Sequence, residues 1–330
     1  MQQRVSPKPL VEGALLAAVA VVLALIGFYV PLVGVVVVFL WPVPVALVHL
    51  RHGLRVSVLT VVVAGLVLTT FVGPLEAVGM VVTFGFAGLA LGVCFDRKVS
   101  PSFTVLVGAV AALASSAVGM LISFIFLKVS PVQMMTEMVE AFQQANNAVG
   151  NSSFMQWMQG LGLVRGEQLE ETRKIWDTTM QAMRMLFPAV FGCSALLISV
   201  LNFETARAVL TRLGYRVEPL PPFETWRLPT SAALGIIVGI LSNAFQSDPR
   251  WHWVYIAGMN VQTVTSMLFL VHGAALAYWF MANRWRFSKP MRICVLVLAF
   301  FQPFLGQVLV LFGILDSVFD WRGLGFGFRR

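Results

Sequence analysis

The stretch EGALLAAVAVVLALIG, residues 12–27, decides the fold class. After Glu12 it is apolar without a break, and the apolar run extends over residues 10–29. As an α-helix, about 20 apolar residues can cross the ~30 Å hydrocarbon core of a membrane. The run is too long for the apolar part of a cleaved signal peptide, and a second apolar run follows it directly. The sequence therefore predicts a retained membrane-spanning helix.

The composition extends this prediction to the whole chain. Hydrophobic residues make up 58% and charged residues 12% of the 330 residues, and the mean hydropathy is +0.83. A typical soluble domain carries about 25% charged residues. The net charge of +8 does not indicate nucleic-acid binding, because the basic residues are spread between apolar runs and form no patch. Three isolated cysteines without CxxC spacing indicate neither a disulfide framework nor a metal site.

The apolar runs predict an all-α, polytopic transmembrane helix bundle of about nine spans. Eight spans is the alternative, in which the first two runs form one re-entrant unit. We divide the chain into a five-span region (1–129), an extracytoplasmic amphipathic helical segment (130–184) and a four-span region (185–330) with a cytoplasmic loop (203–229). The predicted spans are 10–29, 31–49, 56–72, 74–93, 103–127, 185–202, 230–246, 253–281 and 291–315.

The basic residues predict the orientation of these spans. Short cytoplasmic loops are enriched in Lys and Arg. With a cytoplasmic N-terminus, most of the basic residues in short connections fall on the cytoplasmic side, whereas the basic tail at 322–330 falls outside and fits poorly. The cytoplasmic set is Arg4, Lys8, Arg51, Arg55, Arg97, Lys98, Arg207, Arg212, Arg216, Arg227, Arg284, Arg286, Lys289 and Arg292.

The segment 130–184 has two halves with apolar residues at helical spacing, separated by the polar stretch NNAVGNSS at 146–153. This pattern predicts two amphipathic helices. They form either a hairpin that packs on the protein itself or a lid that controls access of a substrate or partner.

Polar groups inside spans are costly in lipid and usually face a bundle interior or a cavity. Glu76, at the outer start of the fourth span, is therefore a candidate ligand contact, although an acid in a first helical turn also complements the helix dipole. The eighth span is the most polar, and Asn260, Gln262 and Thr263 in its outer half are further candidates. Gln302 precedes a proline in the ninth span, which indicates either a broken helix of the transporter kind or an ordinary kink.

Motifs for catalysis are absent from the sequence. It contains no HExxH, GxSxG or Walker A pattern, so we predict no enzyme activity, no cofactor and no metal site. His49 and His52 are three residues apart, but Arg51 lies between them at a membrane edge. Asp316 and Asp320 are four residues apart at the end of the last span, where a charged, hydrogen-bonded helix terminus is a plainer role than catalysis.

Small residues recur at four-residue spacing in the first span, as Ala14 with Ala18 and Ala20 with Ala24. This spacing lets helix backbones approach closely in lipid. The four alanines either pack within this protein or dock on a separate membrane partner.

The stretch LPPFETWRLP, residues 220–229, closes the cytoplasmic loop before the seventh span. Tryptophan favours the headgroup level of a membrane, and arginine favours the inner face. We predict that Phe223, Trp226 and Arg227 form an interfacial anchor, with docking of a partner as the alternative.

Three features together resemble the YybS family, which consists of uncharacterised bacterial membrane proteins with a domain of unknown function. They are RLGYRVEPLPPFETWRLP (212–229), FGILDSVFDWR (312–322) and the alanine-rich first span followed by four more spans. The resemblance covers roughly residues 10–322, and it implies a location in the bacterial plasma membrane.

The first half of that family is similar to the substrate-binding S components of energy-coupling-factor transporters. S components bind vitamins or metal ions and dock on a transmembrane subunit through an AxxxA surface of the first helix. The resemblance thus implies a transporter-like protein that binds a small solute, with Ala14 and Ala18 facing a partner subunit. The alternative function is a membrane scaffold or regulatory interaction protein without a transported ligand. S components usually have six spans, whereas this sequence predicts more.

Overall fold

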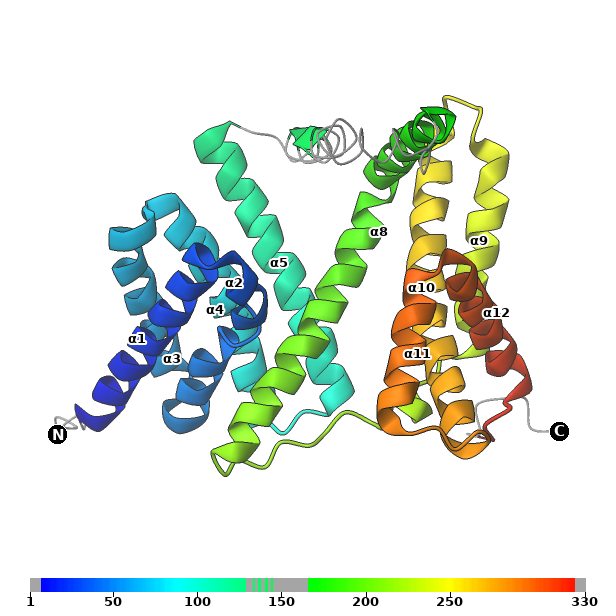
Figure 1. Cartoon of the computed structure of the whole chain (residues 1–330). Coiled ribbons are helices and arrows are strands. Elements are labelled where there is room, and N and C mark those ends of the chain that lie inside the picture. The colour runs from blue at the N-terminus through cyan, green and yellow to red at the C-terminus, as the bar shows by residue number, and fades with distance from the viewer. Residues whose placement is uncertain are drawn as a thin grey trace.

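A computed structural model of the chain is entirely helical in its regular structure (Figure 1). It describes residues 7–128 and 166–323, together with residues 133, 136, 137, 140, 141 and 144, and no strand occurs among them. The all-α fold class is therefore as predicted. The elements are α1 (Pro7–Tyr29), α2 (Pro31–Val37), α3 (Pro42–Val72), α4 (Pro74–Asp96), α5 (Pro101–Leu127), α8 (Gly166–Arg212), η1 (Phe223–Thr225), η2 (Thr230–Ala233), α9 (Leu234–Ser242), η3 (Asn243–Phe245), α10 (His252–Asn283), α11 (Lys289–Phe301) and α12 (Pro303–Phe319).

Prolines begin many of these helices. A proline occupies one of the first two positions of α2, α3, α4, α5, α11 and α12. The first N–H groups of a helix have no partner within it, so a proline there removes no hydrogen bond. The predicted span 31–49 puts Pro42 in mid-helix, and the structure corrects this. The helix α2 ends at Val37, a turn follows, and α3 begins at Pro42.

Six helices are long and apolar enough to cross a membrane, namely α1, α3, α4, α5, α8 and α10. The pair α11 and α12 passes the same test only jointly, and it is bent by 108° at its junction. Among the described residues the count by length is thus six or seven, against about nine predicted. The difference has two sources. Residues 31–72 divide into a short and a long helix, and residues 230–245 form a shorter apolar helix.

The long helix α3 reverses direction at Gly53. Its φ of 77° and ψ of −175° are non-helical, and a residue with a Cβ is strained at such a φ. Before Gly53 the chain runs in the same direction as α4, and after it the chain runs in the opposite direction. The contacts that establish this are Val45 with Gly88, His49 with Gly92, Val61 with Gly85, and Gly65 with Val81.

The first four helices share one apolar core. Ala20 and Ala24 of α1 are 1% and 0% exposed, and they pack with Leu68 of α3 and Phe84 of α4. A second core joins α3, α4, α5 and α8, and its members are Val43, Ala46, Leu91, Val105, Phe203 and Ala206. The helix α8, which contains the sixth predicted span, therefore packs with α3, α4 and α5.

The remaining helices pack closely around α10. Glycines of α9 face α10, with Gly235 against Thr265 and Gly239 against Gln262. Because residue numbers rise along one helix as they fall along the other, α9 and α10 are antiparallel. Contacts of α8 with α5 on one side and with α10 on the other make α8 the link between the two groups of helices.

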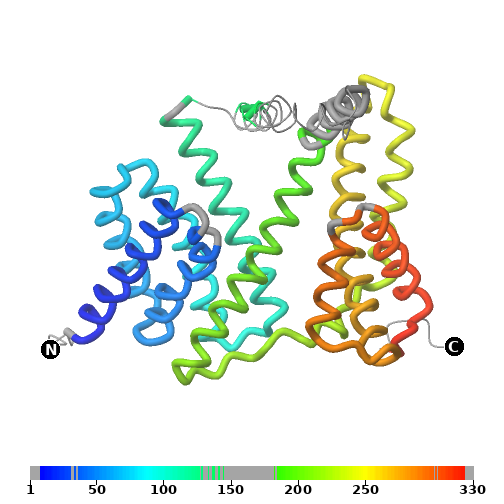
Figure 2. The backbone as a smooth tube through the Cα atoms, in the orientation of Figure 1, coloured from blue at the N-terminus to red at the C-terminus, as the bar shows by residue number. Residues whose placement is uncertain are grey.

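Several chain segments end at the same edge of the molecule. Figure 2 shows the start of α1, the connection between α8 and η1, the turn between α10 and α11, and the end of α12 at its lower edge. The end of α5 lies at the opposite, upper edge. Most of the predicted outer segment, including both halves of its turn at 146–153, lies outside the described residues. The part from Gly166 onward is helical and continuous with α8, as the sequence pattern indicates.

Candidate functional site: a buried charge network

The site lies where α10 and α12 cross. Gly273 of α10 lies against the carbonyl oxygen of Leu309, and Gly313 of α12 lies against that of Phe269. A Cβ on either glycine would clash with the opposing backbone, so glycine is what allows the two helices to touch. His272 lies beside the crossing. It is 1% exposed, and its ring stacks on Phe269 with 6.0 Å between centroids.

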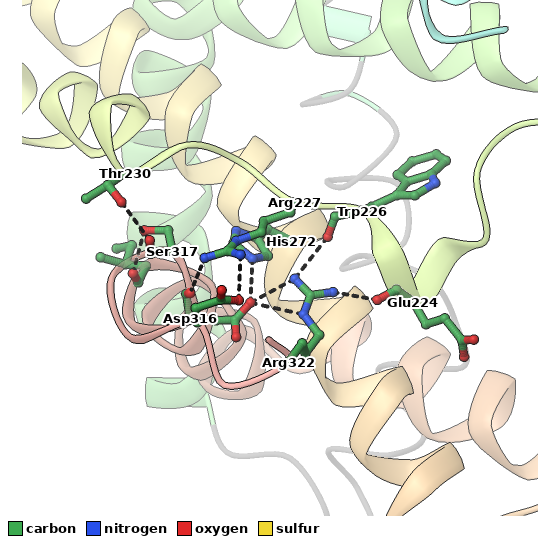
Figure 3. A network of polar contacts seen from close by, with 10 residues as sticks. Glu224, Trp226, Arg227, Thr230, His272, Asp316, Ser317 and Arg322 are labelled. Carbon is green, nitrogen blue, oxygen red and sulfur yellow. Dashed lines mark hydrogen bonds and ion pairs between the residues drawn. The ribbon is translucent and has the colours of Figure 1, made fainter. Parts of the chain in front are cut away.

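Asp316 of α12 faces His272, and its side chain is 0% exposed. Three donors converge on its Oδ2 atom: Nε2 of His272 at 2.9 Å, Nε of Arg322 at 3.0 Å and Nη2 of Arg322 at 2.8 Å (Figure 3). The other oxygen, Oδ1, is buried without a hydrogen-bond partner. An unpaired carboxylate would be very costly in a membrane-spanning segment, and the guanidinium of Arg322 compensates its charge.

The chain end after α12 brings Arg322 back toward the helix. Asp320 has a φ of 50° and its N–H donates to the carbonyl of Asp316 at 3.0 Å, which is a common way for a helix to end. Arg322 also donates from Nη1 to the carbonyl of Glu224 at 2.7 Å and from Nη2 to that of Trp226 at 3.1 Å. This single side chain therefore joins α12 to the connection before α9.

A second ion pair reinforces the same junction. Arg227 pairs with Asp320, and their side chains are 3% and 17% exposed. Arg227 also donates to the carbonyl of Asp316 at 3.3 Å, and the hydroxyl of Thr230 donates to the carbonyl of Ser317 at 2.6 Å. We call His272, Asp316, Arg322, Arg227 and Asp320 the charge network.

The charge network is balanced when His272 is neutral. Its two arginines and two aspartates then sum to zero. A carboxylate accepts hydrogen bonds, so Nε2 of His272 carries the proton that it donates to Asp316. In the neutral tautomer the other nitrogen, Nδ1, keeps a lone pair, and Nδ1 is buried without a partner. The site thus holds two buried acceptor atoms for which the described residues offer no donor, Nδ1 of His272 and Oδ1 of Asp316.

Comparison with known proteins identifies the family. The sequence matches the family model described as "Predicted membrane protein (DUF2232)" over residues 18–317, which is most of the chain. The chain belongs to the DUF2232 family. It is similar to the uncharacterized protein YybS of Bacillus subtilis (strain 168), with 25% identity over 318 residues that cover 96% of this chain and 97% of that protein. The predicted membership of the YybS family is confirmed. No solved structure matches the chain significantly.

In this DUF2232 protein the residues of the predicted interfacial anchor make contacts with their own chain. Arg227 is paired with Asp320 inside the protein instead of reaching lipid phosphates. Phe223 packs between two rings, with centroids 5.4 Å from Trp226 and 5.9 Å from Tyr278 of α10. The indole N–H of Trp226 donates to the carbonyl of Pro221 at 2.8 Å. The stretch 220–229 therefore docks on α10 and α12 of its own chain.

Asn260 holds two helices together. Its Nδ2 donates to the carbonyl of Met185 at 2.8 Å, and its Oδ1 accepts from the N–H of Ala189 at 2.9 Å. In a regular α-helix these two backbone groups bond to each other. Pro188 lies between them in α8, and a proline disturbs the helix ladder at that point. The amide that we predict to contact a ligand therefore bonds the backbone of α8.

The other predicted ligand contacts are spread over the molecule. Gln262 packs against Gly239, with its Oε1 buried and without a partner. The hydroxyl of Thr263 donates to Met259 of its own helix at 2.8 Å. Gln302 is exposed, in the extended junction between α11 and α12. Glu76 is exposed in the first turn of α4, and among the described residues no hydrogen bond or ion pair joins it to α10.

The four candidate docking alanines divide into two pairs. Ala20 and Ala24 are buried in the core of the first helices, so they pack within the protein. Ala14 and Ala18 are exposed on the other face of α1. Only the second pair is placed where a partner could reach it.

A second polar cluster lies at the start of α1. Oε2 of Glu12 is 2.8 Å from Nε2 of His52 and 3.4 Å from Nη1 of Arg51, whose Nε donates to the hydroxyl of Tyr215 at 3.2 Å. The cluster ties α1 and α3 to the segment after α8. His49 is separate from it and bonds to Ser57 at 3.3 Å. Among the described residues, no three His, Cys, Asp or Glu side chains gather in a way that could hold a metal ion.

Sequence reasoning predicted part of the charge network. The charged, hydrogen-bonded helix terminus expected at Asp316 and Asp320 is present, because Asp316 bonds Arg322 and Asp320 bonds Arg227. The pairing of Asp316 with His272 was not predicted. His272 and Asp316 stand out as ionisable groups in apolar runs, and Arg227 and Arg322 flank the last spans. Their partnership was not visible, because 44 residues separate His272 from Asp316 and 93 separate Arg227 from Asp320. Only the crossing of α10 and α12 brings them together.

Proposed function

We propose that this DUF2232 protein binds a small polar solute within the membrane and takes part in its transport, with the charge network as its functional centre. The observation that carries the proposal is the complete burial of Asp316 with His272 and Arg322 in the membrane-spanning part. Ionisable groups at such positions are expensive, and they commonly mark substrate or ion pathways. The bent pair α11 and α12 adds support, since broken helices form binding sites in many transporters.

The hydrogen-bond pattern favours binding over a purely structural ion pair. A structural Arg–carboxylate pair usually uses both oxygens in a two-pronged geometry. Here both guanidinium bonds go to Oδ2 of Asp316, and Oδ1 is left buried without a partner. Together with Nδ1 of His272 it offers acceptors to a solute that carries N–H or O–H donors. The proposal assigns the network a binding role and no catalytic step.

The arrangement of helices supports a refined membrane topology. We infer eight crossings, in which α2 and the first part of α3 form one, the second part of α3 forms the next, and η2, α9 and η3 form the seventh. The bend of 108° makes α11 and α12 a re-entrant hairpin that enters and returns. This assignment replaces the ninth span of the sequence prediction with a hairpin that does not cross.

The same topology supports a cytoplasmic location for both ends of the chain in the bacterial plasma membrane. The pairing of Arg227 with Asp320 puts the end of α12 on the same side as the connection before α9. The basic residues after α12 then join the other basic connections, and the misfit of the C-terminal tail disappears. Arg250 is the basic residue in the described short connections at the opposite edge, as expected of an outer face.

The experiment is native mass spectrometry of the full-length protein extracted from cell membranes in mild detergent. We expect a bound small molecule whose occupancy falls at least about tenfold in Asp316→Asn, which corresponds to about 1.4 kcal/mol of binding free energy. Glu76→Gln is the matched control and keeps the ligand. Equal occupancy in wild type and Asp316→Asn, or an empty wild-type protein, contradicts the proposal. If only Glu76→Gln loses the ligand, the binding site is on α4 and not at the charge network.

Exposure of Ala14 and Ala18 favours a second candidate function, docking on another membrane protein as S components do or as a scaffold would. Two small residues four apart let a foreign helix approach the backbone of α1. We expect Ala14→Leu with Ala18→Leu to abolish co-purification of a membrane partner. The control is Val19→Leu, since Val19 is 47% exposed on the same helix and is not part of the small-residue pair. A partner that survives the alanine substitutions excludes this docking mode.

A further inference from the structure

We propose that His272 is a proton-binding site, and that a proton on its Nδ1 atom releases Arg322 from Asp316 and so unfastens the connection before α9 from α12. The ligand is a proton taken from water at the edge of the membrane where α12 ends. The inference concerns the regulation of the proposed solute site and rests on that function, but a separate measurement tests it.

The first step is the capacity of His272 to accept a proton. Its Nε2–H is committed to Asp316 at 2.9 Å, and its Nδ1 is buried without a partner. The Nδ1 lone pair is therefore unused in this state.

The second step is the charge that such a proton adds. Among the described residues, the charged groups linked to His272 through the network come from two parts of the chain: Asp316, Asp320 and Arg322 from α12 and the residues after it, and Arg227 from the connection before α9, which also gives the backbone carbonyl of Glu224 (Figure 3). With His272 neutral the network sums to zero. A proton leaves one positive charge uncompensated in a buried site, which is unfavourable.

The third step is how the network can relieve that charge. If Arg322 leaves, the charged His272 pairs with Asp316, and Arg227 still pairs with Asp320, so the buried charges sum to zero again. Arg322 is the group that leaves, because it lies in the turn after the end of α12 at Phe319 and is not held inside a helix. Asp316 and His272, in contrast, are held inside long helices.

The fourth step is the consequence for the fold. Arg322 donates to the carbonyls of Glu224 and Trp226, at 2.7 and 3.1 Å. Its departure removes these two bonds together with its bonds to Asp316. The bonds of Arg227 with Asp316 and Asp320 and of Thr230 with Ser317 remain between the connection and α12. Protonation thus loosens the end of the connection nearest to Trp226.

The test is a distance measurement between two spin labels in the full-length protein in lipid nanodiscs. A background without Cys94, Cys193 and Cys294 carries labels at Thr225→Cys and Phe319→Cys, which are both exposed positions. At about pH 8 we expect a single short distance. At about pH 5.5 we expect a second, longer distance whose population has risen at least about tenfold.

Two variants identify the group that titrates. His272→Gln keeps an N–H donor for Asp316 but takes up no proton, so we expect only the short distance at both pH values. Arg322→Gln removes the fastening, so we expect the long distance at both. The matched control, His252→Gln at the opposite end of α10, keeps the wild-type response.

An unchanged distance in the wild-type protein overturns the proposal, whatever the variants do. The same pH response in His272→Gln as in wild type overturns it as well. If the solute is bound by mass spectrometry but the spin-label distance does not change with pH, the proton site fails and the solute-binding function stands. If the distance changes with pH but no solute is bound, the solute-binding function fails and the proton site stands.

Discussion

The side-chain amide of Asn260 on α10 bonds the backbone N–H of Ala189 on α8, one residue after Pro188. It also bonds the carbonyl that a regular helix would join to that N–H, so the amide stands where a backbone bond would otherwise be. The linkage connects the helix that packs on the first bundle with the central helix of the second. A side chain of α10 thus satisfies two backbone groups of α8 at the point where Pro188 interrupts its hydrogen bonding.

Replacing this amide tests its structural role. We expect Asn260→Leu to lower the free energy of unfolding by about 1–2 kcal/mol, because two backbone groups in the membrane lose their partner. Thermal unfolding in detergent measures the effect. Thr263→Val is the control, since Thr263 bonds only to its own helix. If both variants unfold at the same temperature as wild type, the linkage contributes nothing to stability.

Arg322 and Asp316 are expected to behave as one unit. Asp316→Asn or Arg322→Gln alone leaves an uncompensated buried charge and should destabilise the protein by about 3–5 kcal/mol. The double variant should lose less than the sum of the two, by about 1 kcal/mol or more. A double-mutant cycle on thermal unfolding at about pH 8 measures this coupling, and strictly additive effects would show that the pair does not interact in solution.

The crossing of α10 and α12 should not tolerate a Cβ. At Gly273 a Cβ would lie 1.8 Å from the carbonyl oxygen of Leu309, so we expect Gly273→Ala to cost about 1–3 kcal/mol or more. Gly306, on the same α12, is the control because its nearest neighbour, in Leu270, is 4.0 Å away. Gly306→Ala should be neutral or stabilising by up to about 1 kcal/mol, since alanine is the better helix former. Equal effects of the two variants would contradict the close approach.

The re-entrant hairpin predicts the side of the C-terminus. A fluorescent reporter that matures only in the cytoplasm should be active when fused after the last residue, and also when fused in the turn between α10 and α11, after Arg286. The same reporter placed after Phe245, at the opposite edge, should be inactive. An inactive C-terminal fusion together with an active fusion at Arg286 would mean that α11 and α12 form one crossing.

The membrane character and the all-α class follow from local sequence. An apolar run such as 10–29 is unstable when exposed to water, and its length is the about 20 residues that a helix needs to cross a bilayer. Length and composition therefore suffice to predict a membrane span. Helix starts are also local, because prolines fit the first turn. Resemblance of short motifs at 212–229 and 312–322 identified the family, and the family match confirms it.

Span counting was right about one break and wrong about two lengths. The reversal predicted between the spans 31–49 and 56–72 is present, at Gly53. Residues 230–245, in contrast, form only a shorter apolar helix, and the predicted span 291–315 is bent by 108°. Pro303 indicated a break in that span, but the apolar pattern alone could not give its angle.

The sequence by itself determined that the chain is a helical membrane protein with polar and charged groups in its spans. Only the tertiary structure decided what those groups do. Asn260 links α10 to α8, Arg227 forms an ion pair inside the protein, and Asp316 bonds both His272 and Arg322. The physical reason is that a buried charge is tolerable only with a partner, and partners 44 or 93 residues away are set by helix crossings, which no local pattern encodes.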